Sequence, residues 1–455
     1  MHTIYFYVKI YRKYIILPII FLLSFSLQAQ HSKVAQTPPM GWNSYNAFGA
    51  TVKESEVLDN AGFMETQLKS FGWQYVVVDY CWYYPHPAAL YDPPQFGGLL
   101  PAFAMDKFGR LQPAVDRFPS ARRGKGFKPL AEQVHRKGLK FGIHIMRGIP
   151  RQAVAANTRI KGSRYHAADI ADTNSRCTWL NHMYGVNMDK PGAQEYYNSL
   201  FRQYARWGVD YVAVDDIAYP FSEKEIAAVR KAIDLCGRPM VLSLLPGETP
   251  LAKAALAKEY ADTWQVPAAF RDNWTSLLHM FGILHAWESY IGPGHFPDAD
   301  NLNIGQLALR GPLGEPRHSE LNRNELCTMM TLWCIARSPL MYGGDLGQIR
   351  TADLQLIQNK AVLAVNQNSS GNRQLFRNEE QVAWVADVPG THNKYLAVFN
   401  LGETAQLIHV DLKEAGIPGP CVVTDLWTGD QLGRFEAGMR PEVLPHGARL
   451  LLISQ

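Results

Sequence analysis

The sequence predicts an α/β protein, a (β/α)8 barrel (TIM barrel) followed by a small C-terminal antiparallel β-sandwich. Two observations support this. From about residue 38, short apolar runs alternate with helix-length amphipathic segments, which is typical of a parallel sheet covered by helices. After residue 371 the runs are short and alternating and are interrupted by Gly and Pro, which indicates antiparallel strands. The 455 residues are enough for both parts, because such a barrel takes about 250.

Eight segments are assigned to the strands of the barrel. Six of them lack the alternation of a half-exposed strand, as expected for strands buried on both faces, and the segments 40–45 and 295–300 would be the first and the seventh strand. In chain order they are 40–45, 74–82, 140–146, 210–217, 240–245, 261–266, 295–300 and 338–342.

One βαβ unit can be followed residue by residue. Ser222 to Glu225 has the pattern of a capping box, and Ile226, Val229 and Ile233 then share one helical face. Gly237 is a suitable helix stop before the strand at 240. The unit therefore connects the strands at 210–217 and 240–245 by a helix.

The last part of the chain has the period of a half-exposed sheet. Its alternating runs carry no cluster of acids or histidines, so we expect no catalytic role for it. The runs lie at 382–388, 395–401, 406–412 and 448–454. We therefore divide the chain into a barrel over 31–370 and a sandwich over 371–455.

Composition and charge exclude several classes of protein. Hydrophobic residues make up 47% and charged residues 19%, and the mean hydropathy is −0.18, which is neither disordered nor polytopic membrane protein. The net charge is 45 − 41 = +4, with no basic block, so a nucleic-acid partner is not expected. A carbohydrate or another small molecule is the expected partner; the oligomeric state stays open.

The first thirty residues have the pattern of a secretory signal peptide. They contain Lys9, Arg12 and Lys13, no acid, a mostly apolar run over 14–27, and then Gln-Ala-Gln. A short membrane anchor is the alternative, but the run is too short to span comfortably and no Cys follows to carry lipid. We expect export to the periplasm or the extracellular space after cleavage, and no membrane span in the mature chain.

No metal or nucleotide cofactor is expected. The chain has no CxxC, no HExxH, no Walker loop and no GxGxxG at a strand end. The six cysteines are too few for a disulfide scaffold, and their pairing cannot be deduced from the sequence.

Polar residues end four of the predicted strands abruptly, where the active site of a (β/α)8 barrel lies. The first four strands are followed in turn by Trp42, Asn43, Tyr45 and Asn46; by Asp79, Tyr80 and Trp82; by His144 and Arg147; and by Asp215 and Asp216. Asp215 is the strongest candidate for nucleophilic or acid-base work.

Asp215 and Asp216 are neighbours on one strand, and adjacent strand residues face opposite sides. We therefore expect one of the two to enter the barrel mouth and the other to cap the next helix or brace the loop. Aromatic faces such as those of Trp42, Tyr80, Trp82 and Trp264 are suited to a sugar ring. Carboxylates and aromatic rings in one mouth thus favour a carbohydrate substrate.

These residues resemble glycoside hydrolase family 27, the α-galactosidase and α-N-acetylgalactosaminidase (melibiase) family. The similarity runs in order from about 37 to 370. The segments that carry it are Pro38–Ser44 (PPMGWNS), Val78-Asp79, Val212–Asp216 (VAVDD), Trp264, Asp272–Trp274 (DNW), Pro297–Asp300 (PDAD) and Ser338–Met341 (SPLM).

The resemblance implies a retaining cleavage of α-galactosides on a barrel followed by a β-sandwich. It places Asp215 at the catalytic nucleophile, Asp79 at a carboxylate that binds galactose hydroxyls, and Trp42 at the sugar-stacking position. Tyr80 stands where the family has a second such carboxylate, and His144 where it has a tyrosine.

Three further positions depart from the family pattern. Ala213 stands in place of a lysine, Gln265 in place of an arginine, and Ala269 at the position of the general acid/base aspartate. A retaining glycosidase needs both a nucleophile and an acid/base carboxyl. The candidates to replace the latter are Asp272, Asp262, Asp216, Glu248 and His144, of which Asp272 matches a separate family aspartate with a substrate-binding or structural role.

Two hypotheses follow. The first is an exported glycoside hydrolase of the α-galactosidase type with Asp215 as nucleophile. The second is a catalytically impaired relative that serves as a carbohydrate-binding or accessory protein. The losses in the pocket favour the second, whereas the retained aspartates Asp79, Asp215, Asp298 and Asp300 favour the first, because a buried carboxylate without a purpose is costly to keep.

Overall fold

Eight parallel strands form a curled sheet at the centre of the barrel. A computed structural model describes residues 34–87, 102–311 and 313–455, and within them the strand order is β10-β9-β8-β7-β3-β2-β1-β13. A bridge between Leu302 and Tyr342 joins the two edges. The strands are β1 (Met40–Asn43), β2 (Tyr75–Val78), β3 (Lys140–Met146), β7 (Tyr211–Asp215), β8 (Val241–Leu244), β9 (Thr263–Gln265), β10 (Phe296–Asp298) and β13 (Leu340–Tyr342). All eight predicted strands are confirmed.

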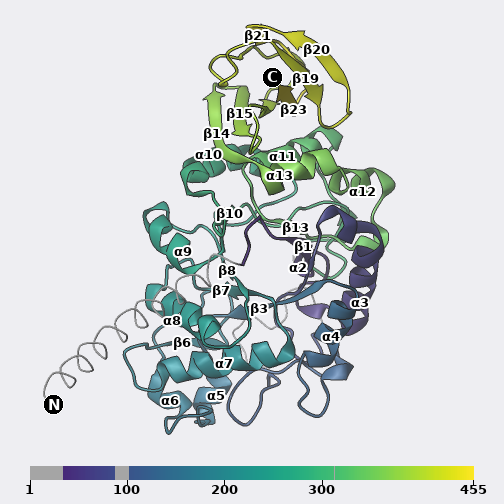
Figure 1. The fold of residues 1–455 in the computed structure, drawn as a ribbon. Coiled ribbons are helices and arrows are strands. Elements are labelled where there is room, and N and C mark those ends of the chain that lie inside the picture. Colours follow the sequence, from purple (N-terminus) through teal and green to yellow (C-terminus); the bar gives the residue numbers. More distant parts are fainter. Residues whose placement is uncertain (1–33, 88–101, 312) are drawn as a thin grey trace, which may run out of the picture.

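Helices surround this sheet and connect its strands (Figure 1). The longer ones are α3 (Glu54–Phe63), α4 (Lys128–Arg136), α7 (Ala193–Trp207), α8 (Glu223–Asp234), α9 (Ala254–Tyr260), α10 (Trp274–Trp287), α11 (Arg323–Ile335), α12 (Thr351–Ile357) and α13 (Lys360–Asn368). Short helices and strands within the loops are α2 (Tyr45–Phe48), α5 (Arg151–Ala155), α6 (Ala167–Ile170), β4 (Ile149–Pro150), β5 (Ala171–Asp172), β6 (Met183–Val186), β11 (Gln306–Leu307) and β12 (Arg317–His318).

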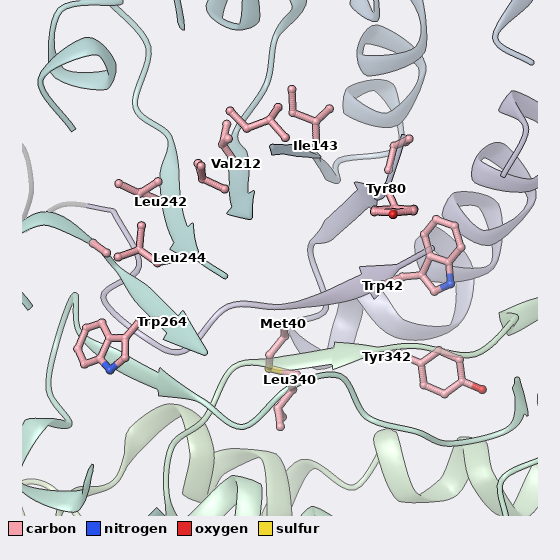
Figure 2. Packing of buried hydrophobic residues seen from close by; sticks show 14 of the residues in the cluster. Met40, Trp42, Tyr80, Ile143, Val212, Leu242, Leu244, Trp264, Leu340 and Tyr342 are labelled. Atoms are coloured by element: carbon pink, nitrogen blue, oxygen red, sulfur yellow. The ribbon is translucent and has the colours of Figure 1, made fainter. Parts of the chain in front are cut away.

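Alternate residues of each barrel strand face opposite sides, and this alternation separates the core from the site. Trp42, Leu244 and Trp264 belong to the large buried cluster, part of which Figure 2 shows. Tyr211 and Ala213 instead belong to a small cluster in the barrel interior. The next inward position on β7 is therefore Asp215.

The predicted capping box at the start of α8 does not form. Ser222 is the N-cap residue but makes no side-chain capping bond, and its hydroxyl donates to the carbonyl of Pro220. Glu225 is instead buried and accepts a hydrogen bond from Arg147 at 2.7 Å. Burial next to a guanidinium thus overrides the local capping pattern.

The C-terminal part is built on an antiparallel sheet in the order β14-β15-β16-β23-β19-β20. The predicted run 406–412 forms two separate short strands, β17 and β18, which pair with β22 and β21. The strands are β14 (Ser370–Arg377), β15 (Gln381–Asp387), β16 (Lys394–Asn400), β17 (Gln406–Leu407), β18 (Val410–Asp411), β19 (Cys421–Asp425), β20 (Gln431–Phe435), β21 (Gly438–Met439), β22 (Glu442–Val443) and β23 (Ala448–Ser454).

This sheet lies against α10, α11 and α13 (Figure 1). At the contact, the ring of His446 stacks on Trp274, the first residue of α10, with a centroid distance of 3.9 Å and an interplanar angle of 10°. His446 Nδ1 lies 2.8 Å from Glu325 of α11, and the hydroxyl of Thr328 donates to the backbone carbonyl of His446 at 2.7 Å. The loop before β23 therefore holds the starts of two barrel helices.

The segment predicted as a signal peptide lies outside the described residues. Among the residues that are described, no helix is both long and apolar enough to cross a membrane.

Candidate active site

A cavity of about 260 Å³ opens at the carboxyl ends of the barrel strands. Its polar lining comes from the ends of β1, β2, β3, β7, β9 and β10 and from the loops that follow β9 and β10. The residues that line it include Asn43, Tyr45, Asp79, Tyr80, His144, Trp179, Asp215, Gln265, Ala269, Phe270, Arg271, Asp298 and Asp300. A monosaccharide with its polar partners fits a cavity of this kind.

Asp215 ends β7 and its carboxylate is held on both oxygens. Oδ1 accepts a hydrogen bond from the backbone N–H of Asp216 at 2.7 Å, and Oδ2 lies 3.2 Å from Nε2 of His144 on β3. Burial by itself lowers the pKa of His144, but the negative charges of Asp79 and Asp215 outweigh it and raise that pKa above its usual value. A protonated His144 therefore stabilises the negative charge of Asp215.

Asp79 ends β2 and is braced by the first strand. Its Oδ2 accepts from Asn43 Nδ2 at 2.7 Å, its Oδ1 accepts from the backbone N–H of Tyr80 at 2.7 Å, and its own N–H donates to Ser44. Asp79 is 5% exposed and lines the cavity. The arrangement fixes an acceptor carboxylate at the cavity wall, as hydroxyl recognition requires.

Asp216 turns away from the cavity, so the expected division of labour between the two adjacent aspartates is found. Arg147 Nη2 donates to Asp216 Oδ2 at 2.7 Å, and Arg147 Nη1 donates to Glu225 at 2.7 Å. Burial raises the pKa of Asp216 to about 6, although Arg147 favours the charged form. Asp216 therefore braces the loop after β7, and in the described structure it does not line the cavity, unlike the substrate-binding role predicted for it.

The structure does not bring three of the predicted aromatic residues into the cavity. Within its described lining, Trp42, Trp82 and Trp264 are absent. The indole N–H groups of Trp42 and Trp82 donate to backbone carbonyls of Gly344 and His144, and Trp264 packs against Trp287 behind β9. Figure 2 shows Trp42 beside Tyr342 within the hydrophobic packing.

The aromatic rings that do line the cavity come mostly from loops. They are Tyr45, Tyr80, Trp179 and Phe270, together with Tyr211 from the barrel interior. The rings of Tyr45 and Tyr80 meet edge to face at 5.5 Å, and Tyr80 meets His144 at 5.9 Å. Alternation along β1 places Trp42 outside and leaves Tyr45 as the stacking candidate, whereas no sequence signal identified Trp179.

Asp272 also lies outside the described cavity lining. Its Oδ1 accepts from Arg317 Nη2 at 2.6 Å and its Oδ2 from the backbone N–H of Glu320 at 3.0 Å. Both oxygens are thus engaged with the 313–320 segment. Of the two roles considered for Asp272, the structural one agrees with this geometry, and direct substrate binding does not.

The wall formed by β9 and β10 has Gln265 at the strand position where the family pattern has an arginine, and Arg271 of the loop after β9 lines the cavity instead. Gln265 and Asp298 are register partners on these strands, and Ala269 and Asp300 line the cavity beside them. Burial and, next, the charge of Asp300 raise the pKa of Asp298 to about 7. No Lys, Arg or His of the described residues forms an ion pair of 4 Å or less with Asp298 or Asp300.

A barrel whose strand ends surround a sugar-sized cavity with several carboxylates, followed by an antiparallel sheet, has the architecture of a glycosyl hydrolase. Comparison with known proteins identifies the family. Residues 180–368 match the family model described as alpha galactosidase A, and residues 378–453 match that of the alpha galactosidase C-terminal beta sandwich domain.

Two solved structures are similar along almost their whole length. The β-L-arabinopyranosidase of glycoside hydrolase family 27 from Geobacillus stearothermophilus is 47% identical, covers 93% of this chain and 99% of that one, and has a TM-score of 0.90. A putative α-N-acetylgalactosaminidase from Bacillus halodurans is 43% identical, covers 92% and 97%, and has a TM-score of 0.83. The α-galactosidase of Cyamopsis tetragonoloba is 26% identical over 94% of this chain and 91% of its own. The chain belongs to glycoside hydrolase family 27.

Proposed function

We propose that the protein hydrolyses terminal non-reducing glycosides of the α-galactose configuration, by a retaining mechanism with Asp215 as the nucleophile. The observation that carries this proposal is the position of Asp215, which ends β7 inside the cavity with one oxygen beside His144. Protonated His144, which the raised pKa of its imidazole favours, would supply the positive charge of the lysine that Ala213 replaces, because Ala213 pairs in register with His144 on the neighbouring strand.

In such a reaction the carboxylate attacks the anomeric carbon, and a covalent glycosyl ester forms and is then hydrolysed. The backbone N–H of Asp216 and the imidazole of His144 both hold the attacking group in place. Neither contact requires a rearrangement, so the nucleophile is preorganised.

Tyr80 favours a pentose, β-L-arabinopyranose, as the sugar that is cleaved most readily. This sugar has the ring configuration of α-galactose but lacks the hydroxymethyl group on C5. Tyr80 replaces a hydroxyl-binding carboxylate by a ring at the cavity wall, which removes an acceptor and adds volume. The β-L-arabinopyranosidase that is 47% identical supports the same substrate.

The first experiment compares release of nitrophenol from aryl β-L-arabinopyranoside, aryl α-galactoside and aryl α-N-acetylgalactosaminide. We expect turnover of the first two with the pentoside preferred, and a change of Asp215→Ala is expected to lower kcat/KM by about 10⁴-fold or more. Isothermal titration with free sugars is the control. Binding without any turnover would contradict the proposal and favour a carbohydrate-binding function.

We also propose that the protein is exported. The basic, apolar and then polar order of residues 1–30 supports this. Cell fractionation of the full chain with N-terminal sequencing is the test. A protein that keeps residue 1 and stays in the cytoplasmic fraction would contradict export.

A further inference from the structure

The cavity lacks a carboxyl group at the usual place of the proton donor. Ala269 lies at the cavity wall in the loop between β9 and α10, and a methyl group cannot transfer a proton. General acid-base catalysis contributes about 10² to 10⁴ in rate, so a hydrolase needs this group from elsewhere. The question is which described side chain reaches the same loop.

Several acids suggested by the sequence are not free to do so. Asp216 and Asp272 are engaged with Arg147 and Arg317 outside the described cavity lining. Asp262 is fully buried and accepts from the backbone of Leu242, while Glu248 is exposed and is also absent from that lining. His144 already contacts the nucleophile, on the β3 side of the cavity.

Asp300 contacts the loop between β9 and α10, which has Ala269 at the position of the family's acid/base aspartate. Its Oδ2 accepts a hydrogen bond from the backbone N–H of Phe270 at 3.0 Å, and Phe270 directly follows Ala269. Its Oδ1 accepts from the N–H of Asn301 at 2.7 Å. Asp300, Ala269 and Phe270 all line the cavity. The carboxyl group of Asp300 is therefore held at the residue that directly follows Ala269, the position of the missing acid.

Strand register places this group on a different wall from the nucleophile. Val214 on β7 pairs with Leu244, Leu244 with Trp264, and Trp264 with Pro297. Asp215 and Asp298 each follow this row by one residue, so they lie level, with β8 and β9 between their strands. Asp300 is two residues further along, toward the barrel mouth, where the leaving group of a bound glycoside lies.

We propose that Asp300 is the general acid/base of this enzyme, in place of the absent aspartate at 269. This inference rests on the proposed function of Asp215. In the first step, Asp215 forms a bond to the anomeric carbon, the bond from that carbon to the leaving oxygen breaks, and the proton of Asp300 goes to the leaving oxygen. In the second step, Asp300 takes a proton from water, whose oxygen attacks the anomeric carbon and displaces Asp215.

The surroundings of Asp300 favour its protonated form. Burial raises its pKa, and the hydrogen bonds from Phe270 and Asn301 only partly oppose this. The charge of Asp79 raises the pKa further, whereas Arg271 acts in the opposite direction. Asp298 is coupled to Asp300, because its Oδ1 accepts from the backbone N–H of Asp300 at 2.9 Å and the charge of Asp300 raises the pKa of Asp298. Two carboxyls that interact in this way disfavour a second negative charge.

The test uses Asp300→Asn, Ala269→Asp and the double variant, with aryl glycosides whose leaving groups differ in pKa. We expect Asp300→Asn to lose about 10² to 10⁴ in kcat/KM on a poorly activated glycoside and far less on a dinitrophenyl glycoside. Azide is expected to restore its turnover and to give a glycosyl azide of the same anomeric configuration as the substrate, because azide attacks the ester of Asp215. Ala269→Asp is expected to recover activity in the Asp300→Asn background.

Asp262→Asn is the control, because Asp262 is a buried carboxyl that lies outside the described cavity lining. Its dependence on the leaving group should equal that of the wild type. An Asp300→Asn enzyme that keeps its thermal unfolding temperature and loses activity equally on all leaving groups, with no azide product, would overturn the inference.

Two further measurements separate this inference from the proposed function. Asp215→Ala with azide should give the inverted glycosyl azide, since azide then replaces the nucleophile. If the wild type has no turnover, the proposed function fails. If the wild type is active and Asp300→Asn is as active as the wild type on every leaving group, only the inference about Asp300 fails. Should Asp300→Asn not fold, the wild-type pH profile decides: the alkaline fall in kcat/KM must be steeper for the poor leaving group.

Discussion

The two sides of the cavity have carboxyl groups with different partners. On the β3 and β7 side, Asp215 lies next to His144, and Asp216, which points away from the cavity, lies next to Arg147. On the β9 and β10 side, Asp298 and Asp300 lie beside Gln265 and Ala269, and Arg271 is the cation of the described lining there. Each aspartate of the first side thus has an ion-pair partner within 4 Å, whereas burial raises the pKa of Asp298 and Asp300 on the second side.

The largest effect on stability is expected from the β3 and β7 side. Arg147→Met would leave Asp216 and Glu225 buried without their guanidinium partner, and removing one member of such a network destabilises a protein by about 3 to 5 kcal/mol. Urea unfolding monitored by circular dichroism measures the loss. An exposed pair such as Lys224 with Asp189 is the control, for which Lys224→Ala should change stability by about 0.5 kcal/mol or less.

A smaller effect of opposite sign is expected from Asp298→Asn on the β9 and β10 side. The pKa of Asp298 is about 7 in the folded protein and lies near 3.8 in the unfolded chain. Between these values only the folded state holds the proton, so the contribution of Asp298 to stability is present at low pH and falls as pH rises toward 7. The asparagine side chain of the variant does not titrate.

We therefore expect Asp298→Asn to gain about 2 to 4 kcal/mol relative to the wild type between pH 4 and pH 8. Chemical unfolding at both pH values provides the measurement. Equal stability differences at the two pH values would show that Asp298 is ionised in the folded protein and that the two walls do not differ as described.

The smallest effect is expected in the rate when His144 is replaced by Gln. Asp79 and Asp215 raise the pKa of His144 despite its burial, so the imidazolium form persists to higher pH and loses its proton as pH rises through that value. Tyr80 and His182 are the other titratable groups near this ring. His144→Gln should lower kcat by about tenfold, near 1.4 kcal/mol, and remove one alkaline limb of the pH profile.

All eight barrel strands could be predicted from the sequence, six of them because they are apolar runs without alternation and the first and seventh because a complete barrel needs them. The sequence predicted that one of Asp215 and Asp216 enters the barrel mouth, but it did not say which one. The ion pair between Arg147 and Asp216 shows that Asp216 is the one that turns away. Alternation along β1 could have predicted Tyr45 in place of Trp42 as the candidate for stacking on a sugar. Asn43 and Tyr45 point to the same side, so Trp42, which lies next to Asn43, faces the helices.

Other parts of the site depend on contacts between distant segments and give no local signal. Trp179 comes from the loop before β6, and the carboxyl of Asp300 reaches Phe270 thirty residues earlier in the chain. The same limit explains the capping box. Ser222 to Glu225 has the residue types of a capping box, but Glu225 binds Arg147, which is 78 residues away in the chain, and does not cap the helix.

The stack of His446 on Trp274 places a C-terminal residue at the end of the loop that contains Ala269. That loop is consequently clamped at both ends, by β9 before it and by the sheet domain after it. A truncated barrel would lose the second clamp, and a barrel grafted onto the sheet of a distant relative would have to rebuild it. Removal of the C-terminal sheet is thus expected to loosen the loop that contains Ala269, although no residue of that sheet belongs to the described lining of the cavity.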